Sequence, residues 1–387
     1  MTKRSHGEGS IQPRGDAWRI RYRVNGERFE RTVQGSRSDA AKALREALKA
    51  GDDGKHVAPD KITFAQWATD WMALKAIKLA PQTLERYGNV LRLHLLPALG
   101  ALPLEKITAT DVDRLYAKLT LAPRTQGLLH IVLKSCFRTA VKKKMLAHNP
   151  VDDAERPSSE DQDAGTVLEE ADLGRLVRGF EGHSLFGIVA TAAFTGARRN
   201  EILALRWKDI DLDKGTISIT RSVEQTKAHG RRVKGPKKAK HARTIQIDPG
   251  LTAILRAEKE KALRLVAGIA GNVGVDLGLI RLPNEALVFP AIGEHLTALR
   301  SPPAVTTVFH TKVKRLGFAV RFHDLRGTHE TILLDRGVPV HVVADRCGHD
   351  PAMLLKVYAK RTKKADASAA DAIATLTKGV LGPTWGQ

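Results

Sequence analysis

Two polar, turn-rich segments divide the 387-residue chain into parts with different hydrophobic periods. Residues 51–61 and 152–163 are rich in Gly, Pro, Asp and Ser, a composition typical of solvated linkers. The acidic second segment has no regular ligand spacing, so a linker explains it better than a metal site does. Apolar residues alternate with polar ones before the first linker and recur at helical spacing after it. The chain is therefore expected to form several domains with a mainly α (α+β) fold.

The N-terminal part is predicted to form a small sheet backed by one helix. Residues 18–24 place apolar side chains on one face and Arg19, Arg21 and Arg23 on the other. Asn25-Gly26 is a hairpin signal, a returning strand is expected over residues 28–33, and an alanine-rich helix over residues 36–50. Neighbouring cations on a sheet repel one another unless an anion joins them. The pattern therefore favours a DNA-contacting face over a merely solvated one.

Residues 62–157 are predicted to be helical, because leucine and aromatic residues recur there at helical spacing. A capping box at Thr63 opens the first helix, and Thr110 with Asp113 is expected to cap the third. A fourth helix is expected over residues 123–145. Its end is basic and supplies three candidate DNA contacts, Lys142, Lys143 and Lys144.

Residues 165–365 are predicted to form a larger domain. Helices are expected at about residues 170–180, 184–194, 199–205 and 251–265, and short strands at 216–220 and 244–247. Between the two strands, the basic stretch 231–243 is expected to form a hairpin turn. Phosphate contact from a solvated loop explains most of its lysines, which include Lys237, Lys238 and Lys240.

The charge balance indicates a polyanionic partner. The formal net charge is +21, and such an excess of Lys and Arg most often serves nucleic acid binding. No run of 18 apolar residues and no secretory leader are visible, so a cytoplasmic protein that does not bind membranes is expected. The two cysteines, Cys136 and Cys347, are too few for a disulfide framework or a zinc site.

Two islands of polar residues carry the candidate chemistry. In the first, a Thr-Gly break at Gly196 precedes Arg198, which is expected in the first turn of the next helix with Glu201 on the same face. In the second, His323 and Arg326 share a helix face, and His349 and Tyr358 follow. Each of these residues alone would be taken as structural. Together they suit attack on a phosphodiester.

The order and spacing of these residues resemble the tyrosine recombinase family, the phage-type integrases. The matching pattern comprises Thr195-Gly196-x-Arg198-x-x-Glu201, Pro236-Lys237, Arg243-Thr244-Ile245, His323-x-x-Arg326, Gly348-His349 and Tyr358. Two small departures are Gly327, where the family often has histidine, and Cys347, where it usually has leucine. Neither lies at a catalytic position.

The resemblance covers nearly the whole chain and implies its domains. Residues 1–55 resemble an arm-type DNA-binding domain with a three-stranded sheet and a helix. Residues 62–157 resemble the helical core-binding (SAM-like) domain, and residues 165–365 the catalytic domain. Residues 366–387 are expected to form a tail helix that packs on a neighbouring protomer.

The resemblance also implies a role for each residue. Tyr358 would be the nucleophile that forms a 3′-phosphotyrosyl bond, and Lys237 the general acid, with Lys238 and Lys240 as alternatives. Arg198, Arg326 and His349 would bind the non-bridging oxygens, and Glu201 would support them. His323 would assist proton transfer or orient the phosphate. Independently of any family, two permanently charged guanidinium forks suit a pentavalent phosphorus transition state, and no cofactor or metal is expected.

The expected function is site-specific recombination, which integrates and excises a phage or other mobile element through a Holliday junction. The implied partners are double-stranded DNA with core-type and arm-type sites and a homotetramer, with a host DNA-bending protein and an excisionase as accessory partners. The setting would be the cytoplasm of a bacterial host, at the nucleoid. Two alternatives share many of these features: a non-catalytic DNA-binding regulator derived from a recombinase, and a type IB topoisomerase.

Overall fold

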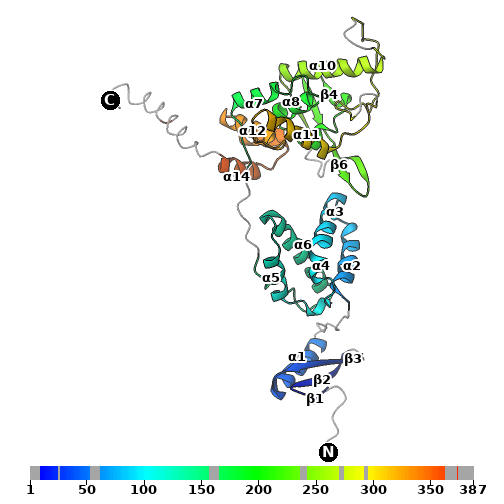
Figure 1. The fold of residues 1–387 in the computed structure, drawn as a ribbon, viewed down its shortest axis with the longest axis vertical. Coiled ribbons are helices and arrows are strands. Elements are labelled where there is room, and N and C mark those ends of the chain that lie inside the picture. The colour runs from blue at the N-terminus through cyan, green and yellow to red at the C-terminus, as the bar shows by residue number, and fades with distance from the viewer. Residues whose placement is uncertain are drawn as a thin grey trace, which may run out of the picture. The chain divides into compact units, whose positions relative to one another are not determined.

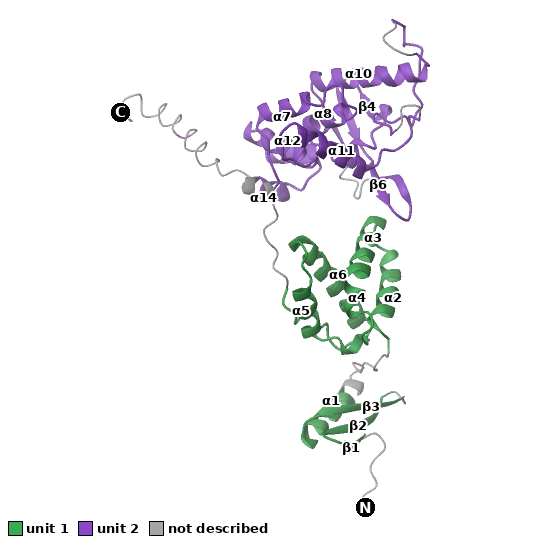
Figure 2. Cartoon of the chain, viewed as in Figure 1, with its two compact units in different colours: residues 1–162 green, residues 163–387 purple. Residues whose placement is uncertain are grey.

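The computed structural model describes residues 9–24, 27–52, 62–156, 165–235, 242–269, 274–291 and 295–361, together with residue 373. The chain splits into two compact units, Met1–Gln162 and Asp163–Gln387 (Figure 2). Helices form most of the regular structure and short antiparallel strands the rest (Figure 1), which confirms the predicted fold class. The two predicted linkers fall largely outside the described residues, so the predicted domain boundaries stay predictions.

A three-stranded antiparallel sheet covered by a helix begins the first unit. The strands lie in the order β1-β2-β3, and the elements are β1 (Ser10–Arg14), β2 (Ala17–Val24), β3 (Glu27–Gln34) and α1 (Arg37–Asp52). The alternation read from residues 18–24 is confirmed, because Ile20 and Tyr22 are buried against Ala40 and Leu44 of α1. This small core contains few large side chains, as expected for such a short segment.

The rest of the first unit is helical. Its elements are α2 (Phe64–Ala76), α3 (Pro81–Val90), a π-helical turn (Leu91–Leu95), α4 (Leu96–Leu99), a 3₁₀ turn (Leu104–Lys106), α5 (Ala109–Lys118) and α6 (Pro123–Lys142). The aromatic residues at helical spacing form the core, where Phe64 stacks on Phe137 of α6 and Trp71 stacks on Tyr87 of α3. These residues are therefore packing residues, as the sequence indicated.

One of the two predicted capping boxes is present, and the other lies at a different pair of residues. The capping box of Thr63 with Gln66 is present as predicted. The third helix, however, is capped by Thr108 with Asp111, two residues before the predicted pair Thr110 and Asp113. The segment Thr-Ala-Thr-Asp-Val-Asp contains both possible boxes, so spacing alone could not choose between them.

The second unit combines helices with two small sheets. The helices are α7 (Glu170–Arg178), α8 (Phe186–Thr195), α9 (Arg199–Ile202), α10 (Pro249–Val266), α11 (Pro302–Arg315), α12 (Asp324–Asp335), α13 (Val340–Cys347) and α14 (Pro351–Arg361), with a 3₁₀ turn at Trp207–Asp209. One sheet has the order β4-β5-β8, and the other pairs β6 with β7. The strands are β4 (Ile210–Asp211), β5 (Thr216–Ile219), β6 (Ser222–Thr226), β7 (Gly230–Lys234) and β8 (Arg243–Gln246).

The hairpin of β6 and β7 corrects the interpretation of the basic stretch. Residues 231–234 belong to a strand paired with β6 and do not form a turn. The buried carboxylate of Glu224 holds this strand, because Arg232 and Lys234 donate to it at 2.9 and 2.7 Å. The strand residues were misread because a run of cations looks like a loop when its acidic partner lies on another strand.

Helix α8 lies at the centre of the second unit. Nearly all of its residues are buried, and it packs against α7, α10 and α12. Helix α12 also packs against α13. This arrangement brings the C-terminal ends of α8 and α13 to the first turns of α12, where Arg198, Arg326 and His349 meet. Among the helices of the described residues, none is long and apolar enough to cross a membrane.

Candidate active site

The turn between α8 and α9 positions Arg198. Helix α8 ends at Thr195, and Arg198 follows in an extended conformation as the N-cap of α9, one residue before the predicted first turn. The backbone N–H and Nη1 of Arg198 donate to Oε2 and Oε1 of Glu201, each at 2.9 Å. Glu201 therefore fixes both the main chain and the guanidinium of Arg198, which is the contact that their spacing predicted.

Arg326 is the buried member of the arginine pair. Its side chain is 2% exposed, whereas that of Arg198 is 36% exposed. Nη1 of Arg326 donates to the Gly196 carbonyl at 2.7 Å and Nη2 to the Cys347 carbonyl at 2.6 Å. Nη2 of Arg198 donates to the Gly348 carbonyl at 2.9 Å. These oxygens lie at the ends of α8 and α13, where carbonyls lack helical partners and carry partial negative charge.

Two glycines make these helix ends possible. Gly196 and Gly348 both have a φ of 64°, in the left-handed region that favours glycine. A Cβ at Gly196 would lie 2.8 Å from both Cys347 Sγ and His329 Cδ2, and one at Gly348 would lie 3.1 Å from Arg243 Nη1. The packing around the arginines therefore depends on the absence of a side chain at both positions.

The imidazoles of His323 and His349 lie beside the guanidinium groups of Arg198 and Arg326, and these four residues form the cationic cluster. Nε2 of His349 accepts a 3.2 Å hydrogen bond from Nε of Arg326. Loss of hydration, followed by the charges of Arg326 and Arg198, lowers the pKa of His349 to about 3. The same three causes, in the same order, lower the pKa of His323, the N-cap of α12. The structure thus brings together both arginines and both histidines predicted for the site.

Arg243 is a site residue that the sequence analysis quoted but gave no role. It begins β8, and its Nη2 donates to Glu201 Oε2 at 2.8 Å while its Nε donates to the Arg346 carbonyl at 2.8 Å. Burial would raise the pKa of Glu201, but the hydrogen bond from Arg243 and its charge dominate, and the pKa falls to about 2. Arg243 therefore links β8 to Glu201, the residue that fixes the guanidinium of Arg198.

Glu330 is a second residue that the sequence analysis missed. It lies one helical turn after Arg326, and its buried carboxylate is 3.0 Å from Nε of that arginine. A spacing of four residues is the usual signal for an intrahelical ion pair, so the contact was readable from the sequence. The adjacent His329 is buried as well, with Nδ1 3.0 Å from the Ala193 carbonyl.

Tyr358 lies on α14, and its hydroxyl donates a 2.8 Å hydrogen bond to Oδ1 of Asp335 at the end of α12. A phenol has a single proton to donate. That proton is directed at Asp335, at the C-terminal end of α12.

Several predicted residues are not tested by these contacts. Lys237, Lys238 and Lys240 lie outside the described residues, as does nearly all of the predicted tail helix. Lys142, Lys143 and Lys144 are exposed at the end of α6. In the N-terminal sheet, Glu30 of β3 lies 3.0 Å from Arg19 Nε and 2.8 Å from Arg21 Nε. Glu30 therefore supplies a negative charge that offsets the repulsion between Arg19 and Arg21. Phosphate is not required for that purpose, so the repulsion between these arginines no longer favours a DNA contact.

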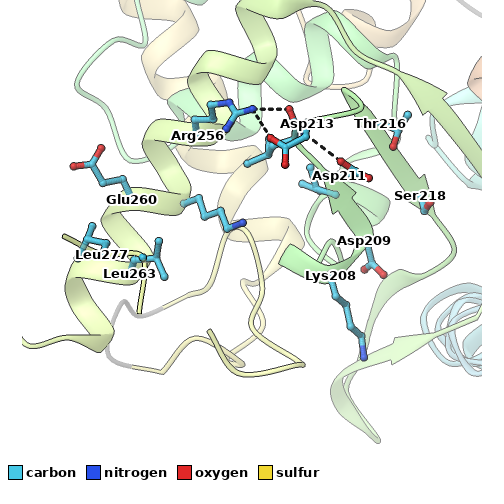
Figure 3. A pocket seen from close by; sticks show the side chains of 14 residues that line it. Lys208, Asp209, Asp211, Asp213, Thr216, Ser218, Arg256, Glu260, Leu263 and Leu277 are labelled. Carbon is cyan, nitrogen blue, oxygen red and sulfur yellow. Dashed lines mark hydrogen bonds and ion pairs between the residues drawn. The ribbon is translucent and has the colours of Figure 1, made fainter. Parts of the chain in front are cut away.

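A cavity of about 700 Å³ lies between α10 and strands β4 and β5 (Figure 3). Arg256 of α10 donates to the Leu212 carbonyl and to Asp213 Oδ1, each at 2.9 Å. None of the described members of the predicted catalytic set lines this cavity. The cavity therefore lies apart from the described residues of that set.

Comparison with known proteins agrees with this geometry. The model of the "Phage integrase family" matches residues 185–365, and that of the "Phage integrase, N-terminal SAM-like domain" matches residues 63–120. An integrase of Streptomyces ambofaciens is 26% identical over 384 residues, covering 93% of this chain and 94% of the relative. The integrase of Mycobacterium phage L5 is 23% identical over 330 residues, covering 84% of this chain and 83% of the relative.

Solved structures share the fold. The Tn1549 transposon integrase in complex with a circular intermediate DNA has a TM-score of 0.65 at 17% identity, covering 81% of this chain and 99% of that chain. A lambda integrase tetramer bound to a Holliday junction has a TM-score of 0.54 at 16% identity, covering 91% of this chain and 96% of that chain. The two matching family models and the relatives that match along most of their length lead to one conclusion: the chain belongs to the phage integrase family of tyrosine recombinases and is a site-specific DNA recombinase of a phage or another mobile element.

Proposed function

We propose that the cluster around Arg198 and Arg326 binds the scissile phosphodiester and that Tyr358 attacks it. The bond between phosphorus and the 5′-oxygen breaks, a 3′-phosphotyrosyl bond forms, and a 5′-hydroxyl leaves. Attack by the 5′-hydroxyl of another strand reverses the step without ATP, because the phosphotyrosyl bond conserves the energy of the cut. The single observation that carries this proposal is the convergence of both guanidinium groups and His349 at the ends of α8 and α13, with His323 close to both arginines at the start of α12.

The two arginines are suited to different parts of the task. Arg198 is partly exposed, so an incoming phosphate meets its guanidinium first. Arg326 is buried beneath and held by carbonyl oxygens, so its charge contributes without reorganisation in a poorly hydrated place. Both favour the transition state, in which the non-bridging oxygens carry more negative charge than in the ground state.

Proton transfer requires an acceptor at the tyrosine and a donor at the leaving oxygen. The lowered pKa of His323 favours a neutral ring, which can accept the phenolic proton. Lys237 is proposed as the donor to the 5′-oxygen, on the basis of its place in the Pro236-Lys237 pattern. Before attack, Tyr358 must exchange its hydrogen bond to Asp335 for one within the cluster.

Assembly on DNA is proposed from the fold and the charge. Lambda integrase, which shares the fold, forms a tetramer on a Holliday junction, and the same assembly is proposed for this chain. The domain limits 1–55, 62–157 and 165–365, with the tail 366–387 packing on a neighbouring protomer, are part of this proposal. The accessory partners proposed are a host DNA-bending protein and an excisionase. The place of action proposed is the bacterial nucleoid.

Trapping of the covalent intermediate tests the proposal. Tyr358→Phe is expected to form no covalent adduct with a nicked suicide substrate while binding DNA as the unmodified chain does. Tyr87→Phe is the matched control, because Tyr87 stacks on Trp71 in the first unit and should be dispensable for the adduct. An adduct that persists in Tyr358→Phe would remove this residue from its role.

Adduct trapping and a plasmid relaxation assay together separate the alternatives. A non-catalytic regulator would form no adduct even with Tyr358 intact. A type IB topoisomerase would relax any supercoiled plasmid without metal or ATP, whatever its sequence, whereas a recombinase acts on its own attachment sites.

A further inference from the structure

The buried carboxylate of Glu330 has no part in the roles proposed above. Its side chain is 4% exposed, and it lies on α12 beside two residues of the cationic cluster. Oε1 of Glu330 is 3.0 Å from Arg326 Nε and 3.4 Å from His349 Nδ1. Placing a carboxylate in such a poorly hydrated position is costly unless charged or hydrogen-bonding partners compensate it.

The contacts of His349 determine which ring nitrogen carries the proton. Nε2 faces Arg326, whose Nε–H donates to it at 3.2 Å, so this nitrogen presents its lone pair. A neutral imidazole has one N–H, which is then on Nδ1, the nitrogen that faces Glu330. The 3.4 Å separation is longer than an ordinary hydrogen bond, and Nδ1 of His349 makes no hydrogen bond in the described structure, so the contact is electrostatic. The ring is thus placed between a cation at Nε2 and an anion at Nδ1.

We propose that Glu330 is a positioning residue that acts through His349. It holds the proton on Nδ1 and keeps Nε2 on the Arg326 side of the ring, where the scissile phosphate binds. When phosphate enters, Nε2 gives up its hydrogen bond from Arg326 Nε, takes a proton from solvent and donates it in a hydrogen bond to a non-bridging oxygen. The imidazolium then lies between two anions, the phosphate and the Glu330 carboxylate, which both stabilise its charge. This inference rests on the proposed function of the cluster.

The surroundings of His349 explain why such a carboxylate is needed. Arg326 from α12, Arg198 from the start of α9, Arg243 from β8 and His323 before α12 all disfavour a positive charge on the ring. Loss of hydration acts in the same direction and is the largest cause of the lowered pKa. A nearby carboxylate is the group that can offset these effects once the phosphate has arrived.

Nitrogen-15 NMR of the full DNA-free chain tests the tautomer directly. The signals of His349 are identified by their loss in His349→Gln. The proton is expected on Nδ1, and a proton found on Nε2 would overturn the proposal. This measurement does not depend on DNA cleavage, so it can contradict the proposed tautomer without contradicting the proposed function. It also decides the tautomer if substitution at position 330 prevents folding.

A double-substitution cycle tests the functional connection. Glu330→Gln, which keeps the shape but removes the charge, should slow adduct formation on the order of tenfold or more, the loss expected for one charge-assisted hydrogen bond. In a His349→Gln background the same change should cost less than about twofold, because its target is absent. Equal losses in both backgrounds would show that Glu330 does not act through His349.

Glu201→Gln is the matched control for the cycle. It removes a buried carboxylate from the same site, but one that contacts Arg198 and Arg243. Its loss of rate should therefore be the same whether residue 349 is His or Gln. A cycle in which Glu201→Gln and Glu330→Gln behave alike would contradict the assignment.

Discussion

The hydroxyl of Tyr358 and the carboxylate of Asp335 are joined by a 2.8 Å hydrogen bond. Asp335 is exposed at the end of α12, so the bond links the proposed nucleophile to the helix that carries Arg326. Two roles are compatible with this contact: a carboxylate that holds the tyrosine before DNA binds, or a base that activates it. We predict the first role, because Asp335 lies at the opposite end of α12 from Arg326.

Substitution of Asp335 separates the two roles. Asp335→Ala is expected to speed the first adduct formed after mixing with DNA, by up to about tenfold, because a charge-assisted hydrogen bond of the resting state is lost. Asp345→Ala, which removes an exposed carboxylate of α13, is the control and should leave the rate unchanged. Slower cleavage by Asp335→Ala in rapid-quench experiments would instead make this residue the base.

The general acid is identified by a change in the leaving group. Lys237→Ala should slow cleavage of ordinary DNA by about 10²- to 10⁴-fold. The rate should recover when the bridging 5′-oxygen is replaced by sulfur, which leaves without being protonated. Lys238→Ala and Lys240→Ala are the matched controls. The lysine whose loss is rescued by sulfur is the acid, and equal defects of Lys237→Ala on both substrates would reject the assignment.

The ion pair of Glu201 and Arg243 predicts a dependence of stability on pH. The folded state lowers the pKa of Glu201 from its ordinary value of 4.5 to about 2. Ionised Glu201 therefore stabilises the fold fully above pH 4.5, by about 3 kcal/mol, and this contribution is lost as the pH falls towards 2. Urea unfolding should show Glu201→Gln less stable than the unmodified chain at pH 6. The difference in unfolding free energy between the two should decrease below pH 4.5.

An exposed glutamate serves as the control for that titration. Glu181→Gln changes a glutamate of the same unit that is largely accessible to solvent. Its unfolding free energy should follow the unmodified chain at every pH. A constant gap between Glu201→Gln and the unmodified chain from pH 6 to pH 3 would mean that the charge of Glu201 does not stabilise the fold.

The crowding at Gly196 can be separated from its backbone strain. Gly196 and Gly182 have φ values of 64° and 72°, but a Cβ would meet close neighbours only at Gly196, since nothing lies within 4 Å at Gly182. Gly182→Ala should therefore cost about 1 kcal/mol of unfolding free energy from strain alone. Gly196→Ala should cost about 1–3 kcal/mol more, because Cys347 and His329 must move. Equal losses in thermal unfolding would contradict the packing argument.

The N-terminal sheet offers a test of its DNA contacts. Arg23 lies opposite Arg28, whereas Arg19 is neutralised by Glu30. If the face contacts phosphate, Arg23→Ala should change how strongly DNA binding depends on salt. The slope of the logarithm of the DNA association constant against the logarithm of the salt concentration should become shallower by about 0.9, which corresponds to the loss of one phosphate contact. Arg19→Ala should change it less. Both slopes are measured with the full chain on a random duplex. Equal changes of slope for the two variants would show that the ion pair with Glu30 does not keep Arg19 from contacting DNA.

Sequence patterns predicted the local features of this fold well. The alternating strand, the capping box at Thr63, the break at Gly196 and the pairing of Arg198 with Glu201 all depend on residues no more than a few positions apart. Such signals are carried by backbone geometry and can be read without tertiary structure. The same rules failed where two matches overlapped, as at Thr108 and Thr110, and where the acidic partner of a basic strand lay on another strand, as at residues 231–234.

Contacts between distant segments could not be read in this way. Arg243 meets Glu201 across 42 positions, and Tyr358 meets Asp335 across 23. Nothing near Arg243 distinguishes it from the other cations of its stretch until β8 is placed beside α9. Glu330 is the exception, since its spacing from Arg326 was visible but its contact with His349 was not.

Main-chain carbonyl oxygens of Gly196, Cys347 and Gly348 clamp the two guanidinium groups. A carbonyl oxygen belongs to the backbone, so these contacts depend on the turns that Gly196 and Gly348 allow and not on a polar side chain at the three positions. Residues that do not contact these two turns can therefore differ while the arginines keep their positions. A recombinase built in this way can change the DNA that it selects without rebuilding the centre that cuts it.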